Sequence, residues 1–207
     1  MKIKRVFIIS PALVDSSPVK GSAALANALC KWVPVVFVTL KCDNNNLSYL
    51  DNCIKLVSLG ECKNWYKKIK KLQNILKNSG SSQSIATISS SFSADFANSF
   101  CTDLAITCTS VRGNLPINYV NTYGFAGKFL SYLHLNRLSK IKHVVSMTSA
   151  MADQVQRYIG RDSVIIGNFL DEKRLLKFKK TCQKQGPYKI IFSGSLCNRK
   201  QPMLIIE

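Results

Sequence analysis

Acidic residues are scarce in this sequence, which has 11 Asp and Glu against 29 Lys and Arg and a formal net charge of +18. Such an excess excludes a generally acidic surface and favours an anionic partner: nucleic acid, an anionic bilayer or a phosphorylated substrate. A lysine-rich surface without any such partner explains the same count equally well. Composition alone leaves both interpretations open.

Long apolar runs and closely spaced cysteines are also missing. No run approaches the roughly 18 apolar residues that a transmembrane helix needs. The short apolar run near the start is interrupted by Pro11, so it is interpreted as a first core strand rather than a signal peptide. The eight cysteines include no Cys-x-x-Cys pair, and most lie in apolar contexts. We therefore expect reduced thiols in a cytosolic protein and no metal site.

Short, β-branched and mostly apolar runs alternate with helical stretches along the chain. This alternation predicts an α/β fold, a Rossmann-like doubly wound parallel sheet with helices on both faces, over residues 1–170. Ligands are expected at the carboxyl ends of its strands. The expected strands are 6–10, 35–40, 54–59, 85–89, 104–109, 144–147 and 164–166, and the expected helices are 22–31, 64–77, 93–100, 124–138 and 150–159.

Polar residues follow three of these strands at the edge where ligands bind. Arg112 suits bidentate contact with a phosphate or a carboxylate, and pairing with a local acid is its structural alternative. Ser22 and Thr148 stand where they can cap the next helix, which is the structural alternative for the hydroxyls. The candidate acceptor and cleft residues are Gly21, Ser22, Arg112, Asn114, Thr148 and Ser149.

The last twenty residues have the pattern of a phosphate-binding unit. An apolar run at 188–193 leads through Gly194 into a basic stretch that contains Lys200, and a second apolar run follows at 203–206. Backbone N–H groups at such a loop and helix start attract an anion, and a lysine adds a positive charge. We predict a linker over 171–187 and the start of a second α/β unit over 188–207.

Three segments together resemble the retaining glycosyltransferases of family 4. They read Val-Val-Ser-Met-Thr-Ser-Ala-Met at 144–151, Val-Ile-Ile-Gly-Asn-Phe-Leu-Asp at 164–171, and Ile-Ile-Phe-Ser-Gly-Ser-Leu-x-x-Arg-Lys at 190–200. The resemblance implies the GT-B fold, in which two Rossmann-like domains face each other across a cleft. The first domain holds the acceptor and the second holds the nucleotide-sugar, of which this chain would contain only the first strand and part of a helix.

The same resemblance implies roles for residues at the end of the chain. It places Gly194 and Lys200 at the donor diphosphate, with Arg199 substituting for the arginine that the family usually has where Ser195 stands here. The family's Glu-x7-Glu motif would lie beyond Glu207. The catalytic carboxylates are therefore not expected among these 207 residues, and the fragment alone is expected to be inactive.

The function implied is transfer of a sugar, with retention, to a surface polysaccharide or a lipid-linked glycan. The nucleotide-sugar donor is a substrate, and no cofactor is expected. The location implied is the cytoplasm, or the inner face of the plasma membrane as a peripheral protein. Two alternatives stay open: a non-catalytic truncated remnant, and a basic nucleic-acid-binding module, although no nucleic-acid-binding motif is present.

The helix expected at 64–77 separates apolar residues from lysines. An apolar stripe runs along one face from Trp65 to Leu76. The lysines interpreted as membrane-facing are Lys67, Lys68, Lys70 and Lys71. They form either an ordinary solvated face or a basic surface that attracts anionic lipid, where a lipid-linked acceptor would lie.

Replacing these four lysines with glutamine is expected to weaken co-sedimentation with anionic vesicles. Each lysine near an anionic surface contributes about 1 kcal/mol, so losing several changes partitioning by orders of magnitude. The far-UV circular dichroism spectrum should not change, because the apolar stripe is untouched. Equal sedimentation of the two proteins would show that the lysines form only a solvated face.

Overall fold

The structure is a computed structural model that describes residues 2–42, 49–168 and 176. The chain divides into two units, Met1–Asp171 and Glu172–Glu207, and the elements below all belong to the first. Nearly all of the predicted linker and the whole segment 188–207 lie outside the described residues. The roles suggested for Gly194, Arg199 and Lys200 therefore stay predictions.

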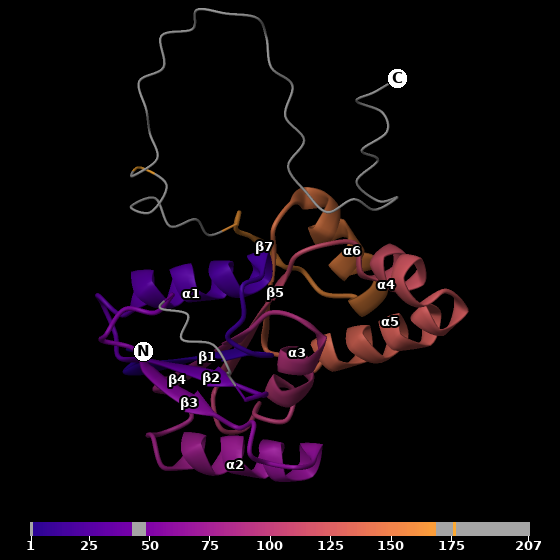
Figure 1. The fold of residues 1–207 in the computed structure, drawn as a ribbon. Helices are drawn as coiled ribbons and strands as arrows, with labels where there is room; N and C mark the ends of the chain where they lie inside the picture. The colour runs from indigo at the N-terminus through magenta and orange to yellow at the C-terminus, as the bar shows by residue number, and fades with distance from the viewer. Residues whose placement is uncertain (1, 43–48, 169–175, 177–207) are drawn as a thin grey trace, which may run out of the picture. The chain divides into compact units, whose positions relative to one another are not determined.

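Strands and helices alternate through the described part of the first unit (Figure 1). The strands are β1 (Arg5–Ser10), β2 (Val35–Thr39), β3 (Lys55–Ser58), β4 (Ile85–Ser89), β5 (Ile106–Val111), β6 (His143–Ser146) and β7 (Val164–Ile165). The helices are α1 (Ser17–Leu29), α2 (Trp65–Lys77), α3 (Phe92–Asn98), α4 (Leu115–Tyr123), α5 (Phe125–Leu138) and α6 (Ser149–Ile159).

The strands form one parallel seven-stranded sheet in the order β3-β2-β1-β4-β5-β6-β7. This confirms the predicted α/β class and the parallel sheet. From β1 the chain proceeds toward one edge of the sheet, and from β4 it proceeds toward the other. The strand order therefore reverses between β1 and β4, and the carboxyl ends of strands at such a point are where open α/β sheets bind ligands.

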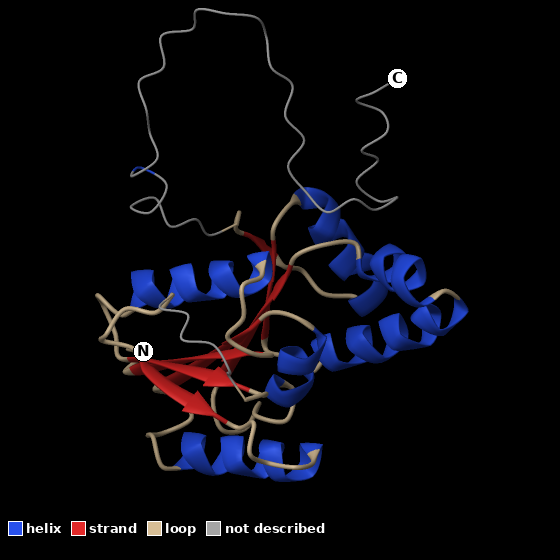
Figure 2. Ribbon diagram, in the orientation of Figure 1, coloured by secondary structure: helices blue, strands red, loops and turns tan. Residues whose placement is uncertain are grey.

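Helices cover both faces of the sheet, as Figure 2 shows with α1 on one side and α2 on the other. Phe7 and Ile9 of β1 pack into a core with Leu72 of α2, whereas Ile8 packs on the opposite face with Ala26 of α1. Successive side chains of a strand point to opposite faces. An apolar run without polar alternation, such as that of β1, can therefore form two cores at once.

The helices differ from the sequence-based prediction chiefly at the start of α1 and at α4. Helix α1 begins at Ser17 rather than at Ser22, because Pro18 at its first turn is compatible with a helix start. Helix α4 was not predicted at all. Asn114 caps it by accepting a hydrogen bond from the Ile117 backbone N–H at 3.2 Å, so a segment interpreted as a loop is the start of a helix.

A tight turn at Gly124, with φ of 57°, joins α4 to α5. Gly127 lets the two helices approach closely, because a Cβ there would lie 2.1 Å from the Tyr119 carbonyl oxygen. The hairpin thereby brings Tyr119 of α4 beside His134 of α5, where their ring centroids are 5.9 Å apart. Both residues contribute to the polar network described next.

Candidate functional site

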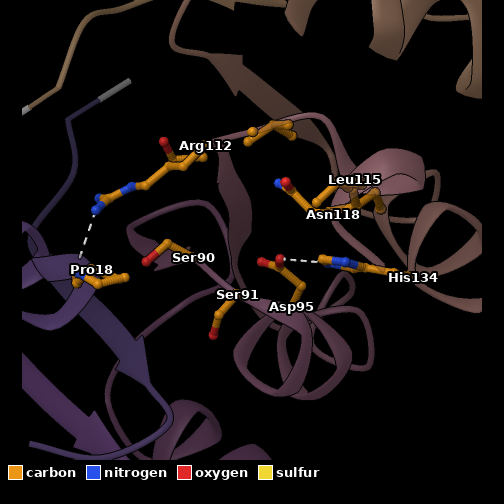
Figure 3. Close-up of a pocket in the computed structure, with 12 residues that line it drawn as sticks. Pro18, Ser90, Ser91, Asp95, Arg112, Leu115, Asn118 and His134 are labelled. Atoms are coloured by element: carbon orange, nitrogen blue, oxygen red, sulfur yellow. Dashed lines mark hydrogen bonds and ion pairs between the residues drawn. The ribbon is translucent and has the colours of Figure 1, made fainter. Parts of the chain in front are cut away.

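Two adjoining hollows lie at the carboxyl ends of β4 and β5, next to the point where the strand order reverses. One has a volume of about 170 Å³ and includes Asp95, Asn118 and His134 in its lining. The other, of about 200 Å³, lies beside α1. Both are lined in part by Ser90, Ser110 and Arg112. Figure 3 shows the first of them, which is called the pocket below.

Arg112 provides the positive charge of this region. It follows β5 directly, and its Nη1 donates to the Pro18 carbonyl oxygen of α1 at 3.3 Å. A Cβ at Gly21 would lie 2.8 Å from the same Nη1, so glycine leaves room for the guanidinium over α1. Burial lowers the Arg112 pKa from its ordinary value, while the charge of Asp95 opposes that shift. Arginine keeps its charge in proteins, so the pocket has a cationic wall.

The turn that follows β4 brings two serines to the same pocket. Ser90 Oγ and Ser22 Oγ are 3.1 Å apart, which links this turn to α1. Ser91 has φ of 113°, a conformation that residues other than glycine rarely adopt and that costs about 1–3 kcal/mol. The surrounding structure holds a strained turn at the rim of the pocket.

Below the pocket, the carboxylate of Asp95 is the centre of a buried polar network. Its Oδ1 accepts hydrogen bonds from Ser89 Oγ of β4 and Thr109 Oγ1 of β5, both at 2.6 Å. Its Oδ2 lies 2.9 Å from His134 Nε2 of α5. Asp95 is only 2% exposed and His134 only 3%. A carboxylate this deeply buried is tolerated because several donors compensate for its lost hydration.

Tyr119 completes the network on the side of α4. Its hydroxyl lies 3.1 Å from His134 Nδ1. Burial raises the Tyr119 pKa to about 12, and the charge of Asp95 and the neighbouring Tyr123 add to the shift. Tyr119 therefore keeps its proton at neutral pH and can donate it to Nδ1, while Nε2–H donates to Asp95. With both ring nitrogens engaged, His134 orients the helices rather than offering a base to a ligand.

Asn98 of α3 extends the network along the sheet. Its Oδ1 accepts from Thr87 Oγ1 at 2.6 Å, and its Nδ2 donates to Ser89 Oγ at 2.9 Å and to the Cys108 carbonyl oxygen at 3.0 Å. Side-chain hydroxyls of β4 and β5 thus meet polar groups of α3 where an apolar contact is usual. This part of the sheet is held by directional bonds, which fix the pocket floor.

The structure brings together half of the six predicted acceptor and cleft residues. Ser22 and Arg112 line the hollows, and Gly21 lies against the Arg112 guanidinium without lining either hollow. Asn114 and Thr148 instead cap α4 and α6, the latter by accepting from the Met151 N–H at 3.3 Å, and Ser149 is the exposed first residue of α6. None of these three lines either hollow.

The four lysines of α2 differ in their surroundings. Lys67 and Lys70 are exposed, whereas Lys71 is half-buried. Lys68 Nζ donates to the Leu40 carbonyl oxygen at 2.6 Å, just after β2. Lys67 and Lys70 are therefore the pair best placed to meet an external surface.

The sequence did not indicate that Ser90, Asp95 and Asn118 belong to this site. Serines after a strand suggest an ordinary loop. A histidine within a helical stretch suggests a structural role, which the two contacts of His134 agree with. A usable signal was present, because the carboxyl end of β4 adjoins that of β5. Residues after β4 should have been considered together with Arg112.

No protein-family model matches this sequence, and no curated protein matches it. Among solved structures, the fold is similar to that of a UDP-glucosyltransferase from Polygonum tinctorium capable of glucosylating indoxyl, solved in complex with 3,4-dichloroaniline. The TM-score is 0.57 at 11% sequence identity, over 92% of this chain and 56% of that enzyme. The chain thus spans little more than half the length of the protein it resembles, and the likeness is one of fold.

Within the described residues, no helix is long and apolar enough to cross a membrane.

Removing the Asp95 carboxylate is expected to destabilise the domain. Asp95→Ala leaves two hydroxyls and an imidazole buried without their acceptor, which should lower the free energy of unfolding by about 2–4 kcal/mol. Urea denaturation followed by circular dichroism measures the change. Asp103→Ala is the matched control, because Asp103 is exposed, and its effect should stay within about 0.5 kcal/mol. Similar effects of the two substitutions would show that the network contributes no net stability.

Proposed function

We propose that this chain is the acceptor-side part of a glycosyltransferase that transfers a sugar from a nucleotide-sugar to a polysaccharide or a lipid-linked glycan. The observation that carries the proposal is the similarity of fold to a UDP-glucosyltransferase over most of the chain. The three segments that resemble retaining glycosyltransferases of family 4 support the finer assignment. A fold can serve several functions, so the site must support the proposal independently.

The pocket at β4 and β5 has the chemistry of an acceptor site. Arg112 offers a forked, charged donor that suits the phosphate of a lipid-linked glycan or the carboxylate of an acidic sugar. Ser90 and Ser110 add hydroxyls that can donate to, or accept from, sugar hydroxyls. The mostly apolar remainder of the wall excludes water, which strengthens these polar contacts.

The second substrate would be held by residues outside the described structure. Gly194, with Arg199 and Lys200, would cradle the donor diphosphate through backbone N–H groups and two side-chain cations. Such groups stabilise the negative charge that develops on the leaving diphosphate. In this proposal the described unit positions the acceptor, and the donor-side residues assist departure of the nucleotide.

Two surface features support a position at the inner face of a membrane. The exposed aromatic side chains of α5 include Phe125, Phe129 and Tyr132, which are 86%, 69% and 67% exposed. The sequence has no acidic residue between Asp103 and Asp153, and Lys128 Nζ lies 5.4 Å from the centroid of the Phe125 ring. Aromatic rings flanked by cations suit the interface of an anionic bilayer. A lipid-linked acceptor would be reached there.

The two alternatives have less support. Nucleic-acid binding rests only on the net charge, and a steep salt dependence of tight binding to DNA or RNA would favour it. A non-catalytic remnant would keep this unit and its pocket. Binding of an acceptor-like glycan to the pocket therefore separates the proposed function from nucleic-acid binding, and sugar transfer by a protein that includes the donor-side residues separates it from a remnant.

Replacing Arg112 with glutamine is expected to abolish binding of acidic glycans. Wild-type protein is applied to an array of oligosaccharides that are neutral, carboxylated or phosphorylated. Retention of the acidic members should fall at least tenfold in Arg112→Gln, because a desolvated charge pair is lost. Arg157→Gln, on the exposed surface of α6, is the matched control and should bind as wild type does.

Retention that falls equally in Arg112→Gln and in Arg157→Gln would show non-specific attraction to the basic surface. Absence of glycan retention by the wild type would contradict an acceptor site in this pocket. Circular dichroism of each variant confirms that the fold is intact.

The 207-residue chain alone is expected to transfer no sugar from UDP-glucose or other nucleotide-sugars. The printed sequence has no Glu-x7-Glu pair, and in the family resembled those carboxylates serve the donor sugar. Release of nucleotide is measured with a coupled assay in the presence of an acceptor mixture. Turnover of about 1 per second or faster, as is common for enzymes, would contradict this part of the proposal.

A further inference from the structure

Three side chains of metal-ligand type converge beside the end of α1. Cys30 follows the last residue of α1, and Asp51 and Cys53 belong to the loop that precedes β3. The two Sγ atoms and a carboxylate oxygen all lie within 4.8 Å of one another. The end of α1 leads into β2 and the loop leads into β3, so the cluster lies at the amino ends of these strands. The pocket lies at the opposite, carboxyl ends of the strands.

A side-chain clamp fixes the loop against the helix. Asn27, one helical turn before Cys30, donates from Nδ2 to the Tyr49 carbonyl oxygen at 2.9 Å and accepts at Oδ1 from the Asp51 N–H at 3.0 Å. A turn in which the Ile54 N–H donates to the Asp51 carbonyl oxygen at 3.0 Å then holds the loop backbone. These bonds hold the backbone of the loop, and Cys30 Sγ donates a hydrogen bond to the Asn27 carbonyl oxygen at 3.3 Å.

We propose that Cys30, Asp51 and Cys53 bind one zinc ion, with a water molecule as the fourth ligand. Two thiolates and a carboxylate are a ligand set that zinc accepts, with bonds of about 2.3 Å to sulfur and about 2.0–2.2 Å to oxygen. On a tetrahedral centre such bonds place ligand atoms about 3.5–3.8 Å apart. The ligand atoms of the cluster, all within 4.8 Å of one another, lie close to that spacing.

The character of the ligands selects the metal. Thiolates favour zinc over magnesium and calcium, which prefer oxygen ligands alone. Cys30 is half-buried, whereas Asp51 and Cys53 are exposed, so the ion can enter from solvent and keep a bound water.

The bound ion would tie the end of α1 to the loop before β3. Burial raises the pKa of the Cys30 thiol to about 11, and a hydrogen bond to Cys53 adds to the shift. In metal-free protein this thiol is therefore protonated at neutral pH, and binding of zinc displaces the proton. The site would stabilise this edge of the sheet and would take no part in sugar transfer.

The test measures metal uptake by the full chain, reduced and freed of metal with a chelator. Cobalt(II) serves as a spectroscopic probe, because thiolate ligands give it a charge-transfer absorption, and zinc then competes for the site. One equivalent of either metal should bind. Cys30→Ser and Cys53→Ser should each lower the affinity for metal at least tenfold and remove much of the charge-transfer absorption. Asp51→Asn should also lower the affinity for metal, but the charge-transfer absorption should remain.

Cys42→Ser and Cys62→Ser are the matched controls, because neither residue belongs to the cluster. Both should bind metal as wild type does. Zinc should raise the thermal midpoint of the wild type and of both controls, and it should leave that of Cys30→Ser unchanged. With chelator present, the melting curves of all variants show whether each of them is folded.

Three outcomes would overturn the proposal. The first is no stoichiometric uptake by the reduced wild type. The second is uptake that Cys30→Ser and Cys53→Ser leave unchanged. The third is a Cys30–Cys53 disulfide, found by peptide mass spectrometry after exposure to air, in a protein whose reduced form binds no metal; it would identify the pair as a redox-active dithiol instead.

Discussion

The buried carboxylate of Asp95 is the interaction on which the rest of this site depends. It accepts hydrogen bonds from hydroxyls of two neighbouring strands and pairs with an imidazole of α5. A charge that is 2% exposed is stable only while all of these donors stay in place. These bonds therefore hold β4, β5, α3 and α5 in one arrangement. The positions of the pocket residues depend on that arrangement.

Electrostatics connects this network to the pocket. The negative charge of Asp95 supports the positive charge of Arg112, whose partial burial alone would disfavour ionisation. Arg112 thereby presents a positive charge to the pocket that it lines.

The amino and carboxyl ends of the parallel strands have different roles. The pocket lies at the carboxyl ends of the strands, where open parallel sheets usually bind ligands if their strand order reverses. The amino ends carry the cluster of Cys30, Asp51 and Cys53, which the proposed zinc ion would stabilise. The spacing of cysteines along the chain does not reveal this cluster, because its ligands come from a helix end and from a loop near another strand. The expectation of no metal site considered only neighbouring cysteines.

Local patterns were enough to determine the strands and most of the helices in the described part of the chain, although α4 was missed. Apolar β-branched runs indicated each strand, and side-chain caps such as Asn64 and Thr148 lie where helices were expected to begin. Arg112 was found because it directly follows a strand. Only the tertiary structure could join Asp95 to His134, since their contact depends on how α5 returns across β5. Sequence determines periodicity and chain direction, whereas contacts between distant residues depend on strand order and helix packing.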